Sequence, residues 1–203
     1  MNLESLLPLV GVIVGWGLKS LSDYLTQRRE DVRRCRTATF YILRAYKSLM
    51  DYERGTRYFR KERPTIDKFE PWRTILAARF LESVEANHKS TAKAVEILAT
   101  LDPPLAVRVD NTIKKVLFTF EKDIGALASA DPDRYVKLVY NQDELVEFAL
   151  GDLNTVAIEL ASRSGFGQKA SVARWFDERR EGTKDFMESM DEQKELLGKV
   201  IAP

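Results

Sequence analysis

The sequence is poor in the residues from which most metal and catalytic sites are built. It contains one cysteine, Cys35, and one histidine, His88, among 203 residues. A single cysteine excludes a disulfide within the chain and a thiolate metal cluster, and it agrees with a reducing compartment. A single histidine excludes metal sites that need two or more imidazole ligands. We therefore expect no metal, no cofactor and no enzymatic activity.

Two short motifs come closest to a recognised site, and both are incomplete. Glu85 and His88 form half of the Glu-x-x-His pairs that hold two iron ions in helical bundles, but the second pair needs a histidine that the chain lacks. The glycine-containing stretch 164–169, SGFGQK, lacks the spacing of a phosphate-binding loop and follows a helical pattern, not a strand. We interpret it as a turn between helices.

The chain also lacks the period-two alternation of β-strands, so we predict an all-α protein. Apolar residues recur in steps of three and four along most of the chain, and prolines and glycines mark the connections. Asp131 followed by Pro132 predicts a cap and the first helical position of a short segment that ends at residue 140. An Asn141–Glu144 capping box predicts a separate helix start after residue 140, and Gly165 suits a helix C-terminus. We expect a bundle of about five helices, over residues 3–54, 71–101, 106–127, 141–163 and 169–200, in addition to the short segment 132–140.

Two of these helices carry the clearest inward-facing patterns. The stripe of the third helix is Ala106, Val109, Ile113, Val116, Leu117, Phe120, Ile124 and Leu127. The stripe of the last helix is Val172, Phe176, Phe186, Met190, Leu197 and Val200. Because these residues repeat with the helical period, we expect both stripes to contribute to the core.

The one long apolar run, residues 6–18, contains no charged residue. Thirteen residues rise only about 20 Å as a helix, but from residue 3 to residue 21 only Glu4 and Lys19 are charged, which gives close to the ~20 residues that a span needs. The apolar side chains lie all round the helix, which favours a transmembrane anchor over an interfacial helix. The anchor residues are Leu6, Leu7, Leu9, Val10, Val12, Ile13, Val14, Trp16 and Leu18.

We accordingly divide the chain into a transmembrane anchor, residues 1–25, that continues into a cytoplasmic α-helical bundle, residues 26–203. Because no cleavage-site pattern follows the run, we expect the anchor to be retained. Trp16 and Tyr24 lie near its basic end, where amphipathic rings prefer the membrane interface. A core helix buried inside a soluble bundle is the alternative for the same run.

Basic residues follow the run and none precede it. Residues 19–63 contain 13 Lys/Arg and 6 Asp/Glu, whereas residues 64–203 contain 19 and 24. By the positive-inside rule the N-terminus lies outside and the remaining chain in the cytoplasm, with a single span in the inner, plasma membrane. Anionic lipid headgroups are the expected partners of the first basic residues, Lys19, Arg28, Arg29, Arg33, Arg34 and Arg36. Nucleic acid is an unlikely partner, because no binding module is recognised and no aromatic residues are interleaved with these arginines.

Gly11 and Gly15 form a Gly-x-x-x-Gly pair inside the anchor, a spacing that lets two helices approach closely. We leave two alternatives open for this pair. It forms the contact of a homo-oligomer, or it faces lipid, since glycine is also common on lipid-facing helix surfaces. The layout of the first 40 residues or so resembles that of single-pass bacterial membrane proteins, which implies no particular activity.

From these features we expect a single-pass membrane protein that acts by binding an unidentified protein partner, as a scaffold, sensor or adaptor. Two alternatives remain open. One is an effector that perturbs membranes or forms pores, which the glycine-bearing anchor would allow. The other is a soluble helical enzyme with the N-terminal run in its core.

Overall fold

The computed structural model describes residues 3–62, 65–120 and 124–182, with side chains for all of these except 3–11, 62, 84–90 and 180–181. The described chain is entirely helical and contains no strand, which confirms the predicted all-α class. Its elements are α1 (Leu3–Glu62), α2 (Ile66–Leu101), α3 (Pro103–Phe120), α4 (Leu127–Ala130), α5 (Pro132–Arg163) and α6 (Phe166–Glu181).

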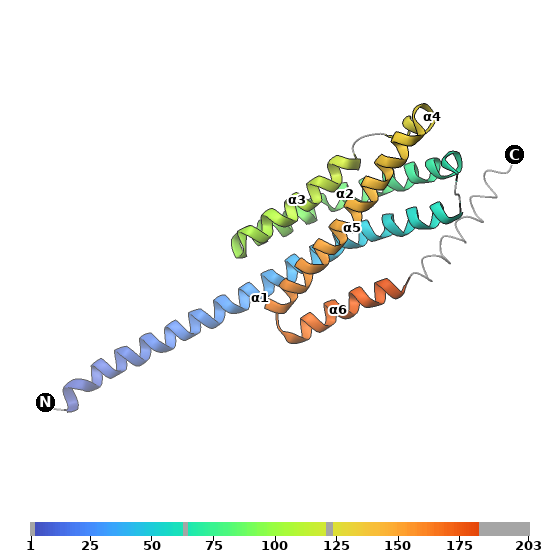
Figure 1. Ribbon diagram of the computed structural model, residues 1–203. Coiled ribbons are helices and arrows are strands. Elements are labelled where there is room, and N and C mark those ends of the chain that lie inside the picture. Colours follow the sequence, from blue (N-terminus) through green and yellow to red (C-terminus); the bar gives the residue numbers. More distant parts are fainter. Residues whose placement is uncertain (1–2, 63–64, 121–123, 183–203) are drawn as a thin grey trace.

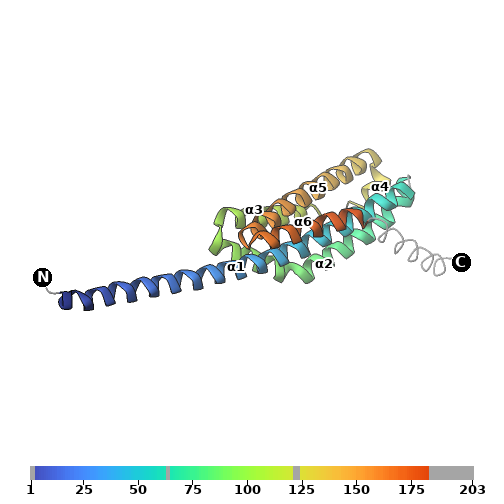
Figure 2. The ribbon, with the colours of Figure 1, turned by 90° about the horizontal axis from the view of Figure 1, so that it is seen from below.

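The longest helix, α1, is the spine of the molecule. Its C-terminal half is surrounded by the other helices, which form the body, and its N-terminal half projects from that body as a single extended helix (Figures 1 and 2). The burial pattern agrees, because the first buried side chain on α1 is Cys35 and every described side chain before Asp31 is exposed. The predicted continuity of the N-terminal helix into the bundle is therefore confirmed.

The sequence prediction that this helix weakens at Gly55 is wrong, because α1 continues for seven residues beyond that glycine. Gly55 is buried, and a β-carbon added there would lie 2.9 Å from both methyl carbons of Leu76 on α2. Packing of α2 against α1 thus accounts for the glycine, which permits a close approach and does not end the helix.

The predicted start of the second helix at Pro71 is also wrong. α2 begins five residues earlier, at Ile66, and Pro71 lies inside it with its ring exposed. Proline removes one helical hydrogen bond, so the first turn needs other support. Two contacts with the spine supply it, namely the burial of Phe69 and the stacking of Trp72 on Phe59 at 4.7 Å between ring centroids.

The two helices predicted on either side of residue 140 are one helix, α5. Asp131 caps it as the sequence indicates, since its carboxylate accepts a hydrogen bond from the Arg134 backbone N–H at 3.1 Å. The predicted capping box at Asn141 and Glu144 is wrong, because the backbone stays helical through both residues. An uninterrupted buried stripe in steps of four and three explains this: Tyr135, Val139, Gln142, Val146, Ala149 and Leu153.

The third and last predicted helices differ from the structure at their ends. α3 ends at Phe120, and residue 127, where we expected its end, begins the separate short helix α4. α6 begins at Phe166, three residues before the expected start, after Gly165 with φ of 117°, a backbone conformation that favours glycine. Val172 and Phe176 are buried as predicted. The remaining predicted core positions of this helix, Phe186, Met190, Leu197 and Val200, lie outside the described residues.

Candidate functional site

The N-terminal half of α1 carries the main candidate site. We use "stalk" for residues 12–30, all of which are exposed. Eight large apolar side chains in this segment are between 44% and 73% exposed, a concentration that soluble monomeric proteins rarely show. They are Val12, Ile13, Val14, Trp16, Leu18, Leu21, Tyr24 and Leu25.

The apolar side chains of the stalk change their distribution at Lys19. A helix turns about 100° per residue. Before Lys19, therefore, Val12, Ile13, Val14, Trp16 and Leu18 point to all sides of the helix. After Lys19, the apolar side chains before Asp31 are Leu21, Tyr24 and Leu25, and they lie on one face. The two parts of the stalk therefore need different surroundings.

Among the described residues, no helix is both long enough and apolar enough to cross a membrane. The first part of the predicted anchor, Leu6, Leu7, Leu9, Val10 and Gly11, lies outside the residues whose side chains are described. The second part, from Val12 to Leu18, projects from the body and is not part of its core.

The predicted headgroup-binding residues are all exposed: Lys19, Arg28, Arg29, Arg33, Arg34 and Arg36. Gly15 is exposed as well, and no atom lies within 4 Å of where its β-carbon would be, so no close contact within this chain requires a glycine there. The partner Gly11 of the predicted Gly-x-x-x-Gly contact belongs to the residues without described side chains.

A second cluster, which the sequence analysis did not identify, is a buried polar network inside the body. Its centre is Arg73 on α2, only 3% exposed. The guanidinium donates to the Tyr135 hydroxyl at 3.2 Å, to the Gln142 amide oxygen at 3.1 Å and to the Glu70 carboxylate at 3.3 Å. Gln142 in turn donates to the carbonyl of Thr119 on α3 at 3.0 Å. The network therefore ties α2, α3 and α5 together through one buried cation.

Burial also determines the protonation of the phenols around Arg73. Desolvation raises the pKa of Tyr52 and of Tyr135, so both stay neutral at physiological pH. The Tyr52 hydroxyl is buried without a hydrogen-bond partner. At the edge of this region Arg60 is ion-paired with Asp143, and desolvation raises the pKa of that carboxyl. Positive and negative groups are therefore matched within the cluster, as expected of a structural network.

One sequence signal was available for this network. Glu70 and Arg73 are spaced three residues apart between Phe69 and Phe80, on the side of α2 that faces α1 and α5. Charged residues of opposite sign at this spacing within an apolar stripe indicate a buried ion pair. The contacts with Tyr135 and Gln142 join residues more than 60 positions apart and have no local signal.

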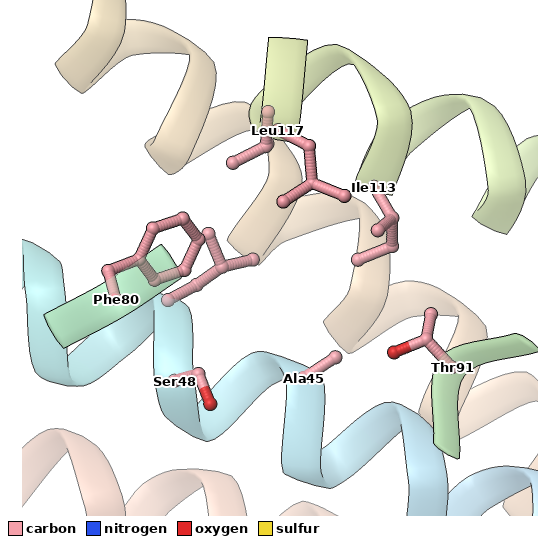
Figure 3. Close-up of a pocket in the computed structure, with 8 residues that line it drawn as sticks. Ala45, Ser48, Phe80, Thr91, Ile113 and Leu117 are labelled. Atoms are coloured by element: carbon pink, nitrogen blue, oxygen red, sulfur yellow. The ribbon is translucent and has the colours of Figure 1, made fainter. Parts of the chain in front are cut away.

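Neither of the two cavities found among the described residues of the body indicates the chemistry of a small-molecule ligand. The pocket between α1, α2 and α3, lined by apolar residues with Ser48 and Thr91 at its edge (Figure 3), has a volume of about 20 Å³, room for about one water molecule. An open groove of about 240 Å³ lies between the start of α2 and α5, and its cation, Arg60, is already paired with Asp143.

Metal binding has no support in the described part of the chain either. No group of three or more His, Cys, Asp or Glu side chains is placed there to hold a metal ion. The side chains of Glu85 and His88 lie outside the described residues. Desolvation by burial raises the pKa of the Cys35 thiol, which makes it a poor nucleophile at neutral pH.

The end of the body from which the stalk projects is held by an ion pair with a testable pH dependence. Asp102, after α2, accepts from Arg163 of α5 at 2.6 Å and from the Leu105 backbone N–H at 3.0 Å. These hydrogen bonds lower the pKa of Asp102 below its ordinary value. A lowered carboxyl pKa stabilises the fold above the unfolded pKa of about 4, and this contribution is lost as the pH falls through the folded pKa.

We therefore expect Arg163→Ala to raise the pKa of Asp102 toward the ordinary value and to narrow the pH range over which the carboxylate stabilises the fold. Carboxyl-carbon NMR titration measures this directly. Glu159→Gln is the control, because it removes the other carboxylate that Arg163 contacts, at 2.7 Å, and leaves the contact with Asp102 in place. An unchanged Asp102 titration in Arg163→Ala would contradict the assignment.

No protein-family model matches the chain, and neither a curated protein nor a solved structure shows significant similarity to it.

Proposed function

We propose that the chain is a single-pass membrane protein in which α1 serves both as the anchor and as the first helix of a cytoplasmic interaction domain. In this proposal the segment up to Leu18 is surrounded by lipid and the N-terminus lies outside the inner membrane. The body binds a protein partner, without catalysis and without a cofactor. The observation that carries the proposal is the projecting stalk, whose described apolar side chains before Lys19 point to all sides and are exposed.

The energetics favour lipid over water around this segment. Burial of apolar surface is worth roughly 25 cal/mol per Å², so several large exposed side chains on one isolated helix carry a large free-energy penalty in water. Most helical stability in proteins also comes from packing, which this projecting segment lacks in water. A bilayer removes both penalties, since it covers the side chains and strengthens the backbone hydrogen bonds.

The continuous helix also sorts the basic residues by their distance from the membrane. With a rise of 1.5 Å per residue, Arg28 lies about 14 Å and Arg36 about 25 Å beyond Lys19 along the helix axis. The headgroup region on one side of a bilayer is only about 5–8 Å thick. Lys19 can therefore contact headgroups directly, and Arg28 and Arg29 can reach back toward them with long side chains. Arg33, Arg34 and Arg36 lie about 21 Å or more beyond Lys19 along the axis, more than a Debye length of about 8–10 Å past the headgroup region, so their attraction to anionic lipids is largely screened.

The outer surface of the body supports the interaction part of the proposal. The outward face of α5 exposes Val136, Tyr140 and Phe148, which lie within about 120° of one another around the helix. Exposed aromatic and aliphatic side chains on one side of a helix are typical of protein-binding surfaces. The buried polar cluster around Arg73 is satisfied among the described residues except for the Tyr52 hydroxyl.

Membrane fractionation tests the anchor. The full-length chain is expected in the membrane pellet after ultracentrifugation without detergent and to resist extraction by alkaline carbonate. A chain that starts at residue 26 is the comparison and is expected in the supernatant. Recovery of the full-length chain in the supernatant would overturn the proposal. Dye leakage from vesicles that contain the purified chain would instead favour the membrane-perturbing alternative.

A further inference from the structure

Contact with lipid does not account for the exposed apolar side chains of the stalk beyond Lys19. Leu21 and Leu25 are 54% and 44% exposed, and Leu25 lies about 9 Å beyond Lys19 along the axis, past most of the headgroup region. Both side chains lie on one face of a helix whose other faces are polar there. An apolar stripe that is confined to one face is typical of a helix that packs against another helix.

The stripe belongs to a longer seam with a strict spacing. From residue 14 to residue 49 the steps alternate between four and three, which is the heptad repeat of coiled coils. The seam consists of Val14, Leu18, Leu21, Leu25, Arg28, Val32, Cys35, Thr39, Ile42, Tyr46 and Leu49. Its second half, from Cys35 onward, is buried in the body of the same chain, whereas Val14, Leu18, Leu21 and Leu25 are 44% to 63% exposed among the described residues.

From this register we propose that the exposed half of the seam, Val14 to Leu25, packs against the same residues of a second copy of this chain in a parallel, in-register pair of helices. The inference rests on the proposed membrane anchor, because two copies inserted in the same orientation present their stalks in parallel and at the same height. Arg28 is the first charged residue on the seam, so it marks the end of the contact.

The proposed contact ends before the body begins, because Leu25 precedes Asp31, the first residue of α1 whose described side chain is not exposed. A heptad pattern drifts about 20° per repeat around a straight helix, so the seam turns by about 60° over the three repeats between Leu21 and Ile42. The side of α1 that faces the second copy in the stalk is therefore turned by about 60° from the side that α1 buries in its own body. Gly11 continues the same spacing on the N-terminal side of Val14, and Gly15 flanks the seam, so small residues adjoin the contact where helices pack within a membrane.

A second copy is favoured over an unrelated helix by the chemistry of this face. Leu18, Leu21 and Leu25 follow one another on the seam, and an identical helix in register presents the same apolar residues at the same spacing. The contact is short, about two heptads among the described side chains, so the membrane must contribute by aligning and concentrating the two helices.

Disulfide cross-linking in membranes tests the pair of helices. In a Cys35→Ala background, single cysteines are placed on the seam (Leu21→Cys or Leu25→Cys) and on the opposite face (Asp23→Cys or Gln27→Cys), and isolated membranes are oxidised with copper phenanthroline. A disulfide needs Cα atoms within about 7 Å, so same-position bonds form only where two identical faces meet. We expect the seam variants to dimerise at least 10-fold faster than the controls. Equal rates at all four positions, or no dimer at any of them, would overturn the proposal.

A second substitution separates this proposal from the membrane anchor. Leu25→Glu in the Leu21→Cys chain places a carboxylate in the contact, and we expect cross-linking to fall at least 10-fold while the chain stays in the membrane pellet. Retention in the pellet without any preference for the seam positions would refute the pair of helices and leave the anchor standing. Seam-specific dimers in the soluble fraction would refute the anchor and leave the pairing in place.

Discussion

Replacing Arg73 with alanine is expected to lower the free energy of unfolding of the body by about 3–5 kcal/mol. The substitution removes the cation that contacts Glu70, the only one that does so among the described residues. Glu70 is 8% exposed, and the Gln142 amide oxygen and the Tyr135 hydroxyl also lose the donor that joins them. An uncompensated buried charge costs more than the pair itself contributes, so the loss is larger than for an ordinary hydrogen bond. Urea unfolding of the full chain in detergent, followed by tryptophan fluorescence and circular dichroism, measures the change.

Two further variants distinguish the buried network from charge effects in general. Arg57→Ala removes ion pairs of a side chain that is 73% exposed, and we expect a loss below about 1 kcal/mol. The double variant Arg73→Met with Glu70→Met removes both charges and is expected to recover much of the stability lost in Arg73→Ala, because no ion remains unpaired. A double variant that is less stable than Arg73→Ala would contradict this account.

The second large effect concerns the anchor. Ile13→Arg places a guanidinium in the middle of the apolar run, where the exchange of isoleucine for arginine costs about 3 kcal/mol of insertion free energy, or roughly 100-fold in the partition between membrane and water. We therefore expect most of this variant in the supernatant after ultracentrifugation. Ile13 points away from the Val14–Leu25 seam, so the substitution tests insertion and not helix pairing.

Gln27→Arg is the matched control for Ile13→Arg. It adds the same side chain to an exposed position beyond Lys19, on the side where positive charge favours the membrane surface. This control is expected to stay in the pellet at the level of the unmodified chain. If both variants were to sediment alike, the apolar run would not be the source of membrane binding.

The sequence prediction was accurate where a local pattern had one physical meaning. Alternating steps of three and four predicted the all-α class and the burial of Val172 and Phe176, and Asp131 followed by Pro132 predicted the cap of α5. It was wrong at Gly55, Pro71 and Asn141, where a residue type that usually ends or starts a helix lies within one. Burial against other helices, of Gly55 itself and of the residues next to Pro71 and Asn141, outweighs a local preference of about 0.7–3 kcal/mol.

The candidate sites divide in the same way. The apolar run and the arginines after it are evident from composition, because solvation by lipid or water is decided residue by residue. The Arg73 network depends on residues brought together from distant parts of the chain, which no local pattern records. The heptad spacing from Val14 to Leu49 was present in the sequence, but its meaning depended on knowing which half the chain itself covers.

The sequence by itself determined the helix periodicity, the scarcity of cysteine and histidine, and the order of apolar and basic segments. Each of these is a property of composition or of residues that are close along the chain. Packing decided where the helices end and which cation is buried. It also decided that α1 leaves the body at Asp31, so that the part of the seam before this residue is exposed. These depend on which distant side chains compete for the same space, and that competition is settled only when the helices are assembled.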